Sequence, residues 1–251
     1  MHFSNMDIAL QLTLWDINIY KSIQPEEIFG QKWSKESTRL LSYNVCRMIQ
    51  RTNEISQWVA TSILIADKSK RIEVFQNMIG IASCLLEIGN FQSFMSIAMA
   101  FESIPISRLK LADSVLKKKY QQELAKFQEL QSPLNKFRKL REAMNEKSIH
   151  IPYLAVVLLD YTAIDENCPQ LVEAPTGEKF LNFYKFQQVD RILFQFFATK
   201  KLIGPTGLFG NFKLEEQHPL YEFVSVLPGF DTDFLYFLSL SREPKHPNNL
   251  N

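Results

Sequence analysis

Glycine is scarce in this chain, and its scarcity constrains the fold more than any other feature of the sequence. There are 8 glycines in 251 residues, whereas an average protein contains about 7% glycine. None of them lies between Asn90 and Thr176. Folds with many strands need glycine at tight turns and bulges, because glycine adopts left-handed backbone conformations without steric cost. The sequence therefore predicts a mostly helical protein.

Apolar residues repeat at helical period between prolines that separate the segments. Spacings of three and four residues predict three consecutive core helices, within 55–63, 75–86 and 91–101. There is no internal repeat, no low-complexity segment and no stretch long enough to be a linker between domains. We therefore expect one all-α globular domain over residues 6–245, followed by a loose tail at 246–251.

Two helix starts are predicted from residues that cap helices. Thr13 followed by Asp16 resembles a weak capping box, and Asp231 precedes Phe234 at the spacing of an N-cap. The alternating leucines at 10–14 are the one pattern typical of a strand. That run is too short to build a sheet.

Charge, cysteine and histidine content exclude several classes of function. With 28 Lys and Arg against 27 Asp and Glu, the net charge of +1 gives no overall field that would attract nucleic acid or an anionic membrane. The segment 108–147 is locally basic, but apolar residues at core spacing interrupt the charges, so we interpret it as the solvated face of two helices. Three scattered cysteines and four histidines without ligand spacing predict no disulfide, no metal site and no cofactor. The longest uncharged run, 88–101, is too short to span a membrane, and we expect a cytoplasmic protein.

The segment from Ile151 to Lys200 carries the most information about function. A nearly unbroken apolar helix is predicted to begin at Pro152 and to end at the carboxylates Asp165 and Glu166. A connection with prolines follows, and then a second amphipathic helix. The end of the first helix carries small and acidic side chains, where a helix buried in a core would carry bulky apolar ones. We therefore expect an αα-hairpin that protrudes from the domain, although composition alone also fits an ordinary helix pair with a polar connection.

Four stretches of the sequence resemble motifs of one known family, in the same order along the chain. They are IALQLTLWDINIYKSIQPEEIFGQKW at 8–33, NFQSFMSIAMAFESIPISRLK at 90–110, IPYLAVVLLDYTAIDENCP at 151–169 with LNFYKF at 181–186, and FLYFLSLSREPK at 234–245. The chain resembles the catalytic domain of Ras-type guanine-nucleotide exchange factors, the domain found in Son of sevenless. The resemblance covers essentially the whole chain.

This resemblance implies that the protein binds a Ras-family small GTPase, of the Ras, Rap or Ral type, and promotes release of GDP so that GTP can enter. No covalent bond changes in this process, so the chain is not expected to be an enzyme in the covalent sense. In the family, the hairpin opens the nucleotide site of the GTPase. The residues that match those acting near the magnesium and phosphate sites are Thr162, Ala163 and Glu166.

The resemblance also assigns residues that support the hairpin. Asn182, Phe183 and Lys185 match the family's Asn-Phe-x-Lys motif, and we expect them to hold the second hairpin helix on the core. Members of the family often carry an N-terminal exchanger motif that packs against the hairpin. Such a domain is a further expected partner of this chain in the full-length protein.

Residues that contact the GTPase are expected on and near the central helix of the domain. By resemblance, Met95 and Glu102 face the GTPase, and Arg51 lies near a basic contact with it. A methionine on a helical stripe is also typical of a core, so Met95 fits either role. Glu102 stands where an amide is common, and Ala155 replaces a usual glycine on the hairpin. These differences affect the expected choice of GTPase more than the activity.

Two alternatives to an active exchange factor follow from the same sequence. The first is a catalytically weak scaffold domain that keeps the fold and the GTPase contact, but no longer speeds nucleotide release. The second is a helical nucleic-acid binder that uses the basic segment 108–147. For the exchange factor, we expect a cytoplasmic location with recruitment to the inner face of the plasma membrane, where any contact with the membrane is indirect, through the GTPase.

Overall fold

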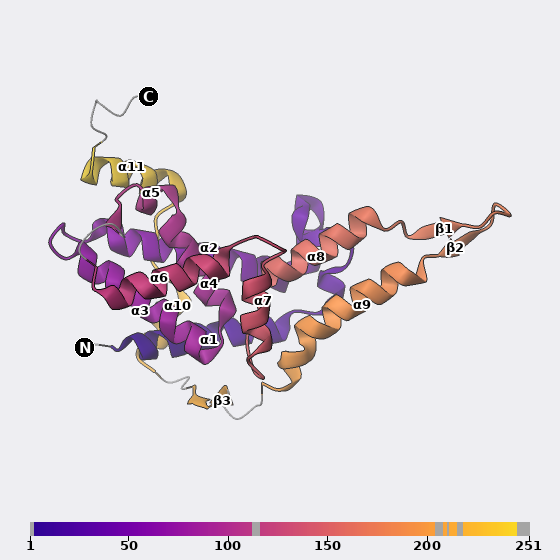
Figure 1. Cartoon of the computed structure of the whole chain (residues 1–251), viewed down its shortest axis with the longest axis horizontal. Coiled ribbons are helices and arrows are strands. Elements are labelled where there is room, and N and C mark those ends of the chain that lie inside the picture. The colour runs from indigo at the N-terminus through magenta and orange to yellow at the C-terminus, as the bar shows by residue number, and fades with distance from the viewer. Residues whose placement is uncertain (1–2, 112–115, 204–207, 210, 215–217, 245–251) are drawn as a thin grey trace.

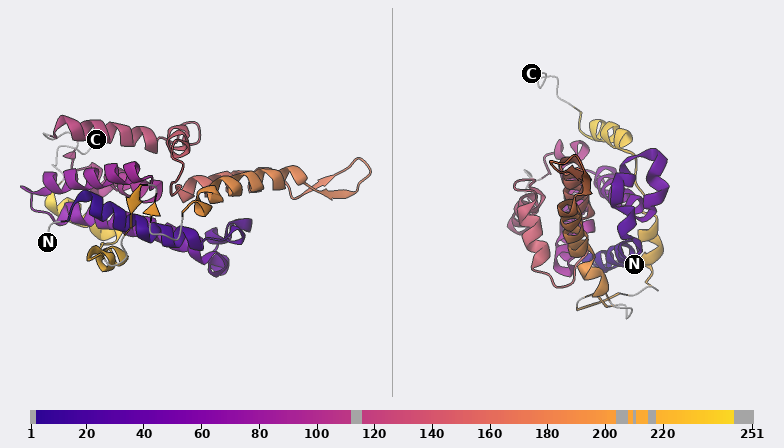
Figure 2. Two further views of the ribbon diagram at one scale, coloured as in Figure 1. Left: turned by 90° about the horizontal axis from the view of Figure 1, so that it is seen from below. Right: turned by 90° about the vertical axis from the view of Figure 1, so that its right-hand side faces the viewer.

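The computed structural model describes residues 3–111, 116–203, 208–209, 211–214 and 218–244. It consists of a helical body and a long hairpin that projects from one end of the body (Figure 1). The same projection is seen from below in Figure 2, so the hairpin is not folded flat against the body. The all-α fold and the protruding hairpin are therefore confirmed. The expected tail at 246–251 lies outside the described residues.

The body is built from helices that follow one another through short connections. In chain order they are α1 (Asn5–Ser22), the 3-10 helices η1 (Pro25–Glu27), η2 (Phe29–Ser34) and η3 (Glu36–Ser42), α2 (Tyr43–Ile65), α3 (Arg71–Ile88), α4 (Phe91–Glu102), α5 (Ile104–Ser107), α6 (Lys118–Gln131), α7 (Arg138–Asn145), η5 (Thr199–Lys201), α10 (Leu220–Ser225) and α11 (Thr232–Arg242). Within the described part of the chain, no helix has both the length and the apolar character needed to cross a membrane.

Helix α4 lies at the centre of the body, where α1, α2, α3 and α6 surround it. Nearly every side chain from Phe91 to Phe101 is buried, including the polar side chains of Gln92, Ser93 and Ser96. The ring of Phe94 packs edge-on against Phe127 of α6, with centroids 5.2 Å apart, and Phe101 packs in the same way on Phe75 of α3, at 5.0 Å. The three core helices predicted from the sequence are confirmed as α2, α3 and α4.

The basic segment forms α6 and α7 on the outside of the body. Phe127, Leu130 and Leu140 are buried, whereas basic side chains such as Lys118 and Lys126 are exposed. The apolar residues therefore hold these helices on the core while the charges face water. The interpretation of this segment as a solvated face is confirmed.

The helix starts agree with the sequence at one place and differ at another. Asp231 caps α11 by accepting a hydrogen bond from the backbone N–H of Phe234, as predicted. The capping box predicted at Thr13 and Asp16 is wrong, because both residues are buried in the middle of α1, and the leucines near them are helical as well. The capping box of α1 is formed by Ser4 and Asp7 instead.

The hairpin contains a two-stranded ribbon that sequence reasoning missed. Its elements are α8 (Leu154–Asn167), β1 (Leu171–Glu173), β2 (Lys179–Leu181) and α9 (Phe183–Ala198). The antiparallel strands are three residues long and exposed on both faces, so they lack the alternation that identifies a strand. Gly177, with φ of 82°, lies in the turn between them, where a left-handed backbone favours glycine. A second short pair, β3 (Leu208–Phe209) with β4 (Phe212–Lys213), lies at the edge of the body.

Candidate functional site

One face of α8 is turned towards the body across an open groove. Helical spacing places Ala155, Leu159, Thr162 and Glu166 along this face. Leu159 is 54% exposed, Thr162 is partly exposed, and both Ala163 and Glu166 are exposed. The face is therefore available to a partner along most of its length.

The groove between α8 and the body is lined mainly by apolar side chains. A hollow of about 410 Å³ lies between Trp33 of η2, Ile49 of α2, Met99 of α4 and the face of α8. A neighbouring hollow of about 390 Å³ continues beside α4 to Phe137. Met99 and Tyr153 line both hollows, and the Tyr153 hydroxyl donates a hydrogen bond to Met99 Sδ at 3.2 Å. We treat the two hollows as one feature, the α4–α8 groove.

The residues that the sequence assigned to GTPase contact differ in how they lie in this groove. Glu102 is exposed at its rim, where Gln128 Nε2 lies 3.4 Å from one of its carboxylate oxygens. Met95 is only 2% exposed and lies in the wall of the groove, so it supports the surface more than it forms it. Met99, which sequence reasoning missed, is 45% exposed at the centre of the groove. Helical spacing could not have found it, because Met95 and Met99 are four residues apart and share one face of α4.

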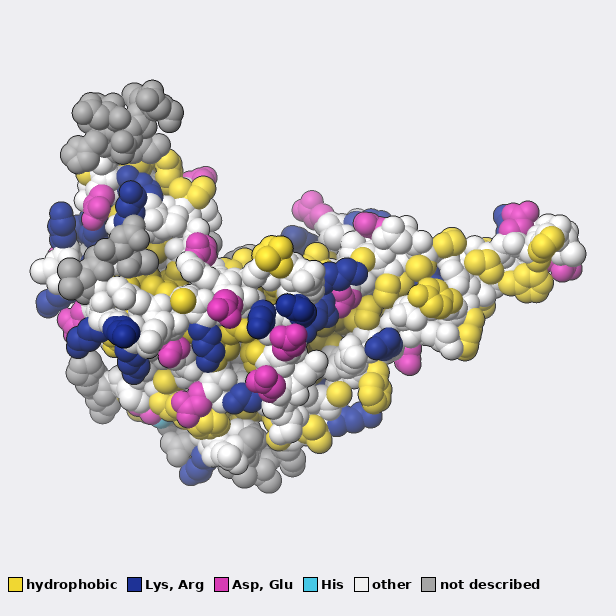
Figure 3. Space-filling model, viewed as in Figure 1, with side chains coloured by type: hydrophobic (Ala, Val, Ile, Leu, Met, Phe, Trp, Pro, Cys, Tyr) yellow, Lys and Arg dark blue, Asp and Glu magenta, His cyan; other side chains and the backbone are white. Residues whose placement is uncertain are grey.

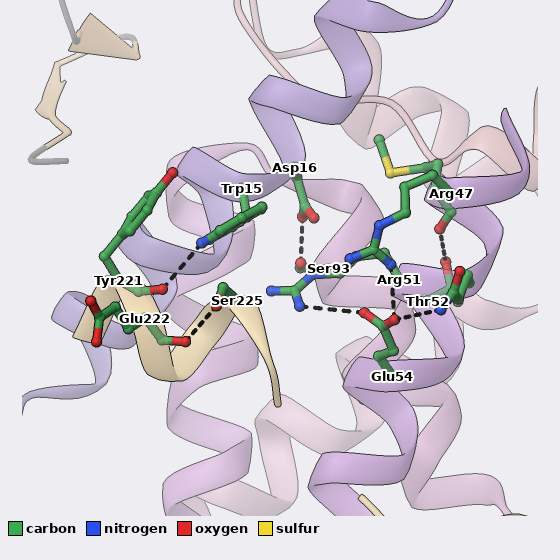
Figure 4. A network of polar contacts seen from close by, with 12 residues as sticks. Trp15, Asp16, Arg47, Arg51, Thr52, Glu54, Ser93, Tyr221, Glu222 and Ser225 are labelled. Carbon is green, nitrogen blue, oxygen red and sulfur yellow. Dashed lines mark hydrogen bonds and ion pairs between the residues drawn. The ribbon is translucent and has the colours of Figure 1, made fainter. Parts of the chain in front are cut away.

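Arg51 is placed in the core, so its prediction as a surface contact needs correction. Its side chain has no exposed area, and its guanidinium lies between the carboxylates of Asp16 and Glu54 (Figure 4). The distance from Arg51 Nη1 to Glu54 Oε2 is 3.6 Å, and Arg47 Nη1 holds the other oxygen of Glu54 at 2.8 Å. Arg51 therefore lies inside the body, where its charge acts on Asp16 of α1, and it is not retained as a direct contact with the GTPase.

Asp16 completes this buried network from α1. It accepts a hydrogen bond from Asn90 Nδ2 at 2.7 Å and another from the hydroxyl of Ser93. Burial raises the pKa of Asp16, whereas the charge of Arg51 and the hydrogen bonds from Ser93 and Asn90 oppose that rise. Asn90 also caps α4 by accepting from the Ser93 backbone N–H at 3.0 Å. The network thus fixes the position of α4, and with it one wall of the groove.

Two of the three residues predicted to hold the second hairpin helix on the core bind the first half of the hairpin instead. Asn182 caps α9 and donates a hydrogen bond from Nδ2 to the Pro169 carbonyl at 2.9 Å. Lys185 Nζ lies 2.8 Å from Asp165 Oδ1, and this contact is the main reason that the pKa of Asp165 is lowered. Phe183 is 70% exposed and does not pack on the core. The expectation is therefore corrected: Asn182 and Lys185 lock the hairpin internally, and Phe183 has no such supporting contact.

The first half of α8 is fixed to the body by a backbone hydrogen bond and by a side-chain ion pair. The backbone N–H of Leu154 donates to Gln92 Oε1 of α4 at 2.9 Å. Both terminal nitrogens of Arg141, on α7, hold the carboxylate of Asp160 at 2.8 and 2.9 Å, a bidentate geometry that adds directional specificity. The helix therefore leaves the body in a defined direction.

The described residues bring together no group of three or more His, Cys, Asp or Glu side chains that could hold a metal ion. The carboxylate of Glu166 makes no hydrogen bond or ion pair with any other residue that the structure describes. Its carboxylate is therefore free to act on a partner.

Comparison with known proteins identifies the family. The model of the RasGEF domain matches residues 7–187, which include the body helices up to α7, all of α8 and the start of α9. The chain belongs to the RasGEF domain family.

Curated relatives agree with this assignment. The Ras guanine nucleotide exchange factor R of Dictyostelium discoideum is 30% identical over 246 residues, covering 98% of this chain and 14% of that protein. The Ras guanine nucleotide exchange factor J of the same organism is 32% identical, covering 96% of this chain and 28% of that protein. The mouse Ras-specific guanine nucleotide-releasing factor RalGPS1 is 34% identical over 190 residues, covering 74% of this chain and 32% of that protein. The chain thus spans about a third or less of the length of these relatives.

Proposed function

We propose that this chain, over residues 6–245, is the catalytic domain of a guanine-nucleotide exchange factor for a Ras-family small GTPase of the Ras, Rap or Ral type. The observation that carries the proposal is the α4–α8 groove, an apolar channel bounded on one side by a projecting helix whose exposed face bears Thr162, Ala163 and Glu166. The names of the relatives, which include several Ras guanine nucleotide exchange factors, support the same activity.

Exchange of this kind is a matter of differential binding and involves no covalent step. The domain must bind the nucleotide-free GTPase more tightly than the GDP-bound form. Linkage then requires that the domain weaken GDP binding by the same factor. Each tenfold weakening needs about 1.4 kcal/mol of differential contact. Contacts that act at the nucleotide site are therefore needed, in addition to those that hold the GTPase.

The outer part of α8 is suited to act at the nucleotide site. Glu166 can place its unpaired carboxylate where phosphate oxygens would lie, which repels the nucleotide and accepts hydrogen bonds from the N–H groups that otherwise bind phosphate. The methyl groups of Thr162 and Ala163 can occupy the space beside a bound magnesium ion, and they offer it no strong ligand. Loss of that cation removes charge that offsets the phosphates, so GDP binding weakens further.

The α4–α8 groove is suited to hold the GTPase while α8 acts. Met99 and Leu159 provide exposed apolar surface above the buried Tyr153, and such surface favours association when a partner covers it. Glu102 at the rim can pair with a basic residue of the GTPase. Met95 and Arg51 lie beneath this surface and act by keeping α4 and α2 in place.

A release assay with fluorescent GDP tests the proposal and separates it from the scaffold alternative. Purified Ras, Rap and Ral proteins are loaded with the nucleotide and mixed with micromolar domain. We expect accelerated release from at least one of them. Binding to the nucleotide-free GTPase without accelerated release from any of them would instead establish a scaffold domain.

The variant Glu166→Ala tests the proposed role of α8 in nucleotide release. We expect the exchange rate to fall about tenfold, equivalent to about 1.4 kcal/mol, with unchanged helicity in circular dichroism because Glu166 is exposed. The matched control is Asp190→Ala, which removes a carboxylate from an exposed position of α9. Equal rates for the two variants would contradict the role of Glu166.

The proposed activity also suggests where the protein works and what accompanies it. We propose a cytoplasmic domain that reaches the inner face of the plasma membrane only through its GTPase. Exposed apolar side chains gather along the hairpin (Figure 3), and on α9 they include Tyr184, Phe186 and Phe194. An N-terminal exchanger motif in the full-length protein is the partner we propose for this surface.

A further inference from the structure

Phenylalanines lie side by side on the outer face of α11, the last helix of the body. Phe234 and Phe237 are exposed on the helix itself, and Phe230 is exposed just before it. The ring centroids of Phe230 and Phe234 are 4.6 Å apart, and those of Phe234 and Phe237 are 6.3 Å apart. The three rings therefore form one continuous apolar row.

The row extends to α10 through the packing of both segments on α2. Phe223 of α10 stands edge-on to Trp58 of α2, with centroids 6.4 Å apart. One turn further along α2, the Thr61 hydroxyl accepts a hydrogen bond from the backbone N–H of Phe230 at 2.9 Å. Val226, at the end of α10, is 79% exposed. The α10–α11 surface is defined here as Phe223, Val226, Phe230, Phe234 and Phe237.

Polar contacts on the inner side of α11 fix the direction in which its phenylalanines point. The buried Ser239 donates a hydrogen bond from Oγ to the Pro105 carbonyl at 2.6 Å. Arg108 donates to the Ser239 carbonyl at 2.7 Å and to the Glu243 carbonyl at 2.6 Å. Arg71 Nη1 lies 3.1 Å from Glu243 Oε1. The helix cannot turn its rings inward without breaking these contacts, so the exposed rings belong to the folded state.

The spacing of the exposed residues indicates that a helix covers this surface. Positions 230, 234, 237 and 241 follow one another at intervals of four, three and four residues. These intervals are those of the seam along which one helix packs against another. A helix that faces only water on its outer side normally carries polar residues there. Here Ser241 is the single polar residue of the seam.

The area of the α10–α11 surface matches one side of a dimer interface. Its phenylalanines are between 40% and 65% exposed, and at roughly 200 Å² for a whole side chain the surface presents on the order of 500 Å² of apolar area. A standard interface buries about 800 Å² on each partner, and homodimer interfaces are about 65% apolar. The apolar area present is therefore about what a homodimer of standard size needs.

The charges of α11 complement a second copy of the same helix. Asp231 and Asp233 lie at its first turn and Arg242 lies at its last, all three exposed. When two copies of α11 pack antiparallel about a two-fold axis, the carboxylates of each helix lie near the arginine of the other. The helix dipoles then also run in opposite directions, which is favourable. A parallel arrangement would instead bring like charges together.

We propose that the α10–α11 surface is the contact between two copies of this chain, with α11 packed antiparallel on α11 of the second copy. Helix α11 lies at one end of the body, and the hairpin projects from the other end (Figure 1, Figure 2). The dimer therefore leaves the α4–α8 groove and Glu166 open on both copies. The inference goes beyond the proposed function and does not depend on exchange activity.

Sedimentation velocity over a range of concentrations tests the dimer directly. We expect the unaltered chain to dimerise within about 1 to 100 μM or below, as interfaces of this area do. Phe237→Glu places a carboxylate in the centre of the seam and should weaken dimerisation at least about 30-fold, the effect of losing a central aromatic contact. Circular dichroism should be unchanged, because Phe237 is 65% exposed.

A matched control separates this surface from the other exposed phenylalanines. Phe194→Glu makes the same substitution at a similarly exposed position of α9, at the other end of the molecule, and should leave dimerisation as it is. An unaltered chain that stays monomeric up to about 100 μM overturns the proposal. Dimerisation of Phe237→Glu that is as tight as that of Phe194→Glu overturns it as well, because the contact would then lie elsewhere.

Charge reversal tests the antiparallel arrangement. Asp233→Arg and Arg242→Asp, made in separate chains, each bring like charges together across the two-fold axis, and we expect each to dimerise about two- to fivefold more weakly, as for exposed ion pairs. An equal mixture of the two variants should form a tighter heterodimer, because every arginine then faces a carboxylate. In parallel packing the unaltered chain already places like charges together. Single variants that dimerise as tightly as the unaltered chain would therefore exclude the antiparallel contact.

Discussion

Helices α4 and α8 have similar lengths, 12 and 14 residues, and both are rich in apolar side chains, yet they have different surroundings. Other helices enclose α4 on every side but the one that carries Met99 and Glu102, so most of its apolar residues stabilise the body. Only the first two turns of α8 are enclosed, and all of its buried residues lie between Leu154 and Tyr161. Beyond Tyr161 the helix leaves the body and presents its face to solvent. The comparison indicates that similar sequences serve stability in α4 and, under the proposed function, recognition in α8.

The largest effect is expected from truncation in α4. Phe94→Ala removes a fully buried ring that packs on Phe127. We expect a loss of about 3–5 kcal/mol in the free energy of unfolding, from lost burial and from the cavity that remains. Urea unfolding followed by circular dichroism measures it. A loss below about 1 kcal/mol would mean that the body repacks around α4, and the contrast with α8 would then be invalid.

The second-largest effect is expected from a change in the buried polar network that holds α4 against α1 and α2. Arg51→Met leaves the buried carboxylate of Asp16 without its nearby positive charge, and we expect a loss of about 3 kcal/mol in the free energy of unfolding at neutral pH. Burial already raises the pKa of Asp16, and loss of Arg51 raises it further. The folded variant then binds a proton at a pH where the unfolded chain does not. The deficit should therefore shrink as the pH falls through that raised pKa.

The double variant Arg51→Met with Asp16→Asn provides the control for this network. Because the buried charge is absent, we expect part of the lost stability to return and the pH dependence of the deficit to disappear. A deficit in Arg51→Met that stays constant as the pH is lowered from neutrality to the ordinary carboxyl pKa of about 4 would assign the effect to packing instead of charge.

The sequence predicts the enclosed part of the molecule better than the exposed part, for reasons that particular residues make clear. Helical period identifies α2, α3 and α4, because burial on one side requires apolar side chains at fixed spacing. Arg51 and Asp16 were misjudged because charged residues are usually exposed. For Arg51, the spacing already indicated burial, because Arg51 lies on the same face of α2 as the apolar residues Met48 and Ile55.

The exposed part of the molecule is harder to predict, because the positions of its helices and strands depend on contacts between segments that are distant in the sequence. The ribbon at the end of the hairpin has strands too short for any periodic signal. The side-chain hydrogen bond from Gln31 of η2 to Asp165 of α8 joins residues that are 134 positions apart in the sequence. The resemblance to a known family predicts which residues of α8 act, but only the structure shows that Met99 is exposed while Met95 is buried.

The third prediction separates recognition from stability on α8. Leu159→Ala truncates an exposed side chain in the α4–α8 groove, so we expect the free energy of unfolding to fall by less than about 1 kcal/mol. The affinity for the nucleotide-free GTPase should fall by about 1–2 kcal/mol if this leucine is central to the interface. Calorimetric titration measures the affinity. The control Leu171→Ala truncates a similarly exposed leucine on the ribbon, outside the groove, and equal affinities for the two variants would exclude the groove as the contact surface.

The smallest effect is expected from the lock between α8 and α9, and it depends on pH. Lys185 chiefly, with help from Gln31, lowers the pKa of Asp165 below its ordinary value near 4. A carboxyl group with a lowered pKa in the folded state stabilises that state above its unfolded pKa, and loses this contribution as the pH falls from about 4 through its folded value. Asp165 is partly exposed, so solvent screening limits the contribution to about 0.2–1 kcal/mol. The free energy of unfolding of the unaltered chain should therefore exceed that of Asp165→Asn by a constant amount from pH 8 to about pH 5, and the excess should shrink below about pH 4. An excess that grows on acidification would require a raised pKa, and would mean that Lys185 does not bind this carboxylate in solution.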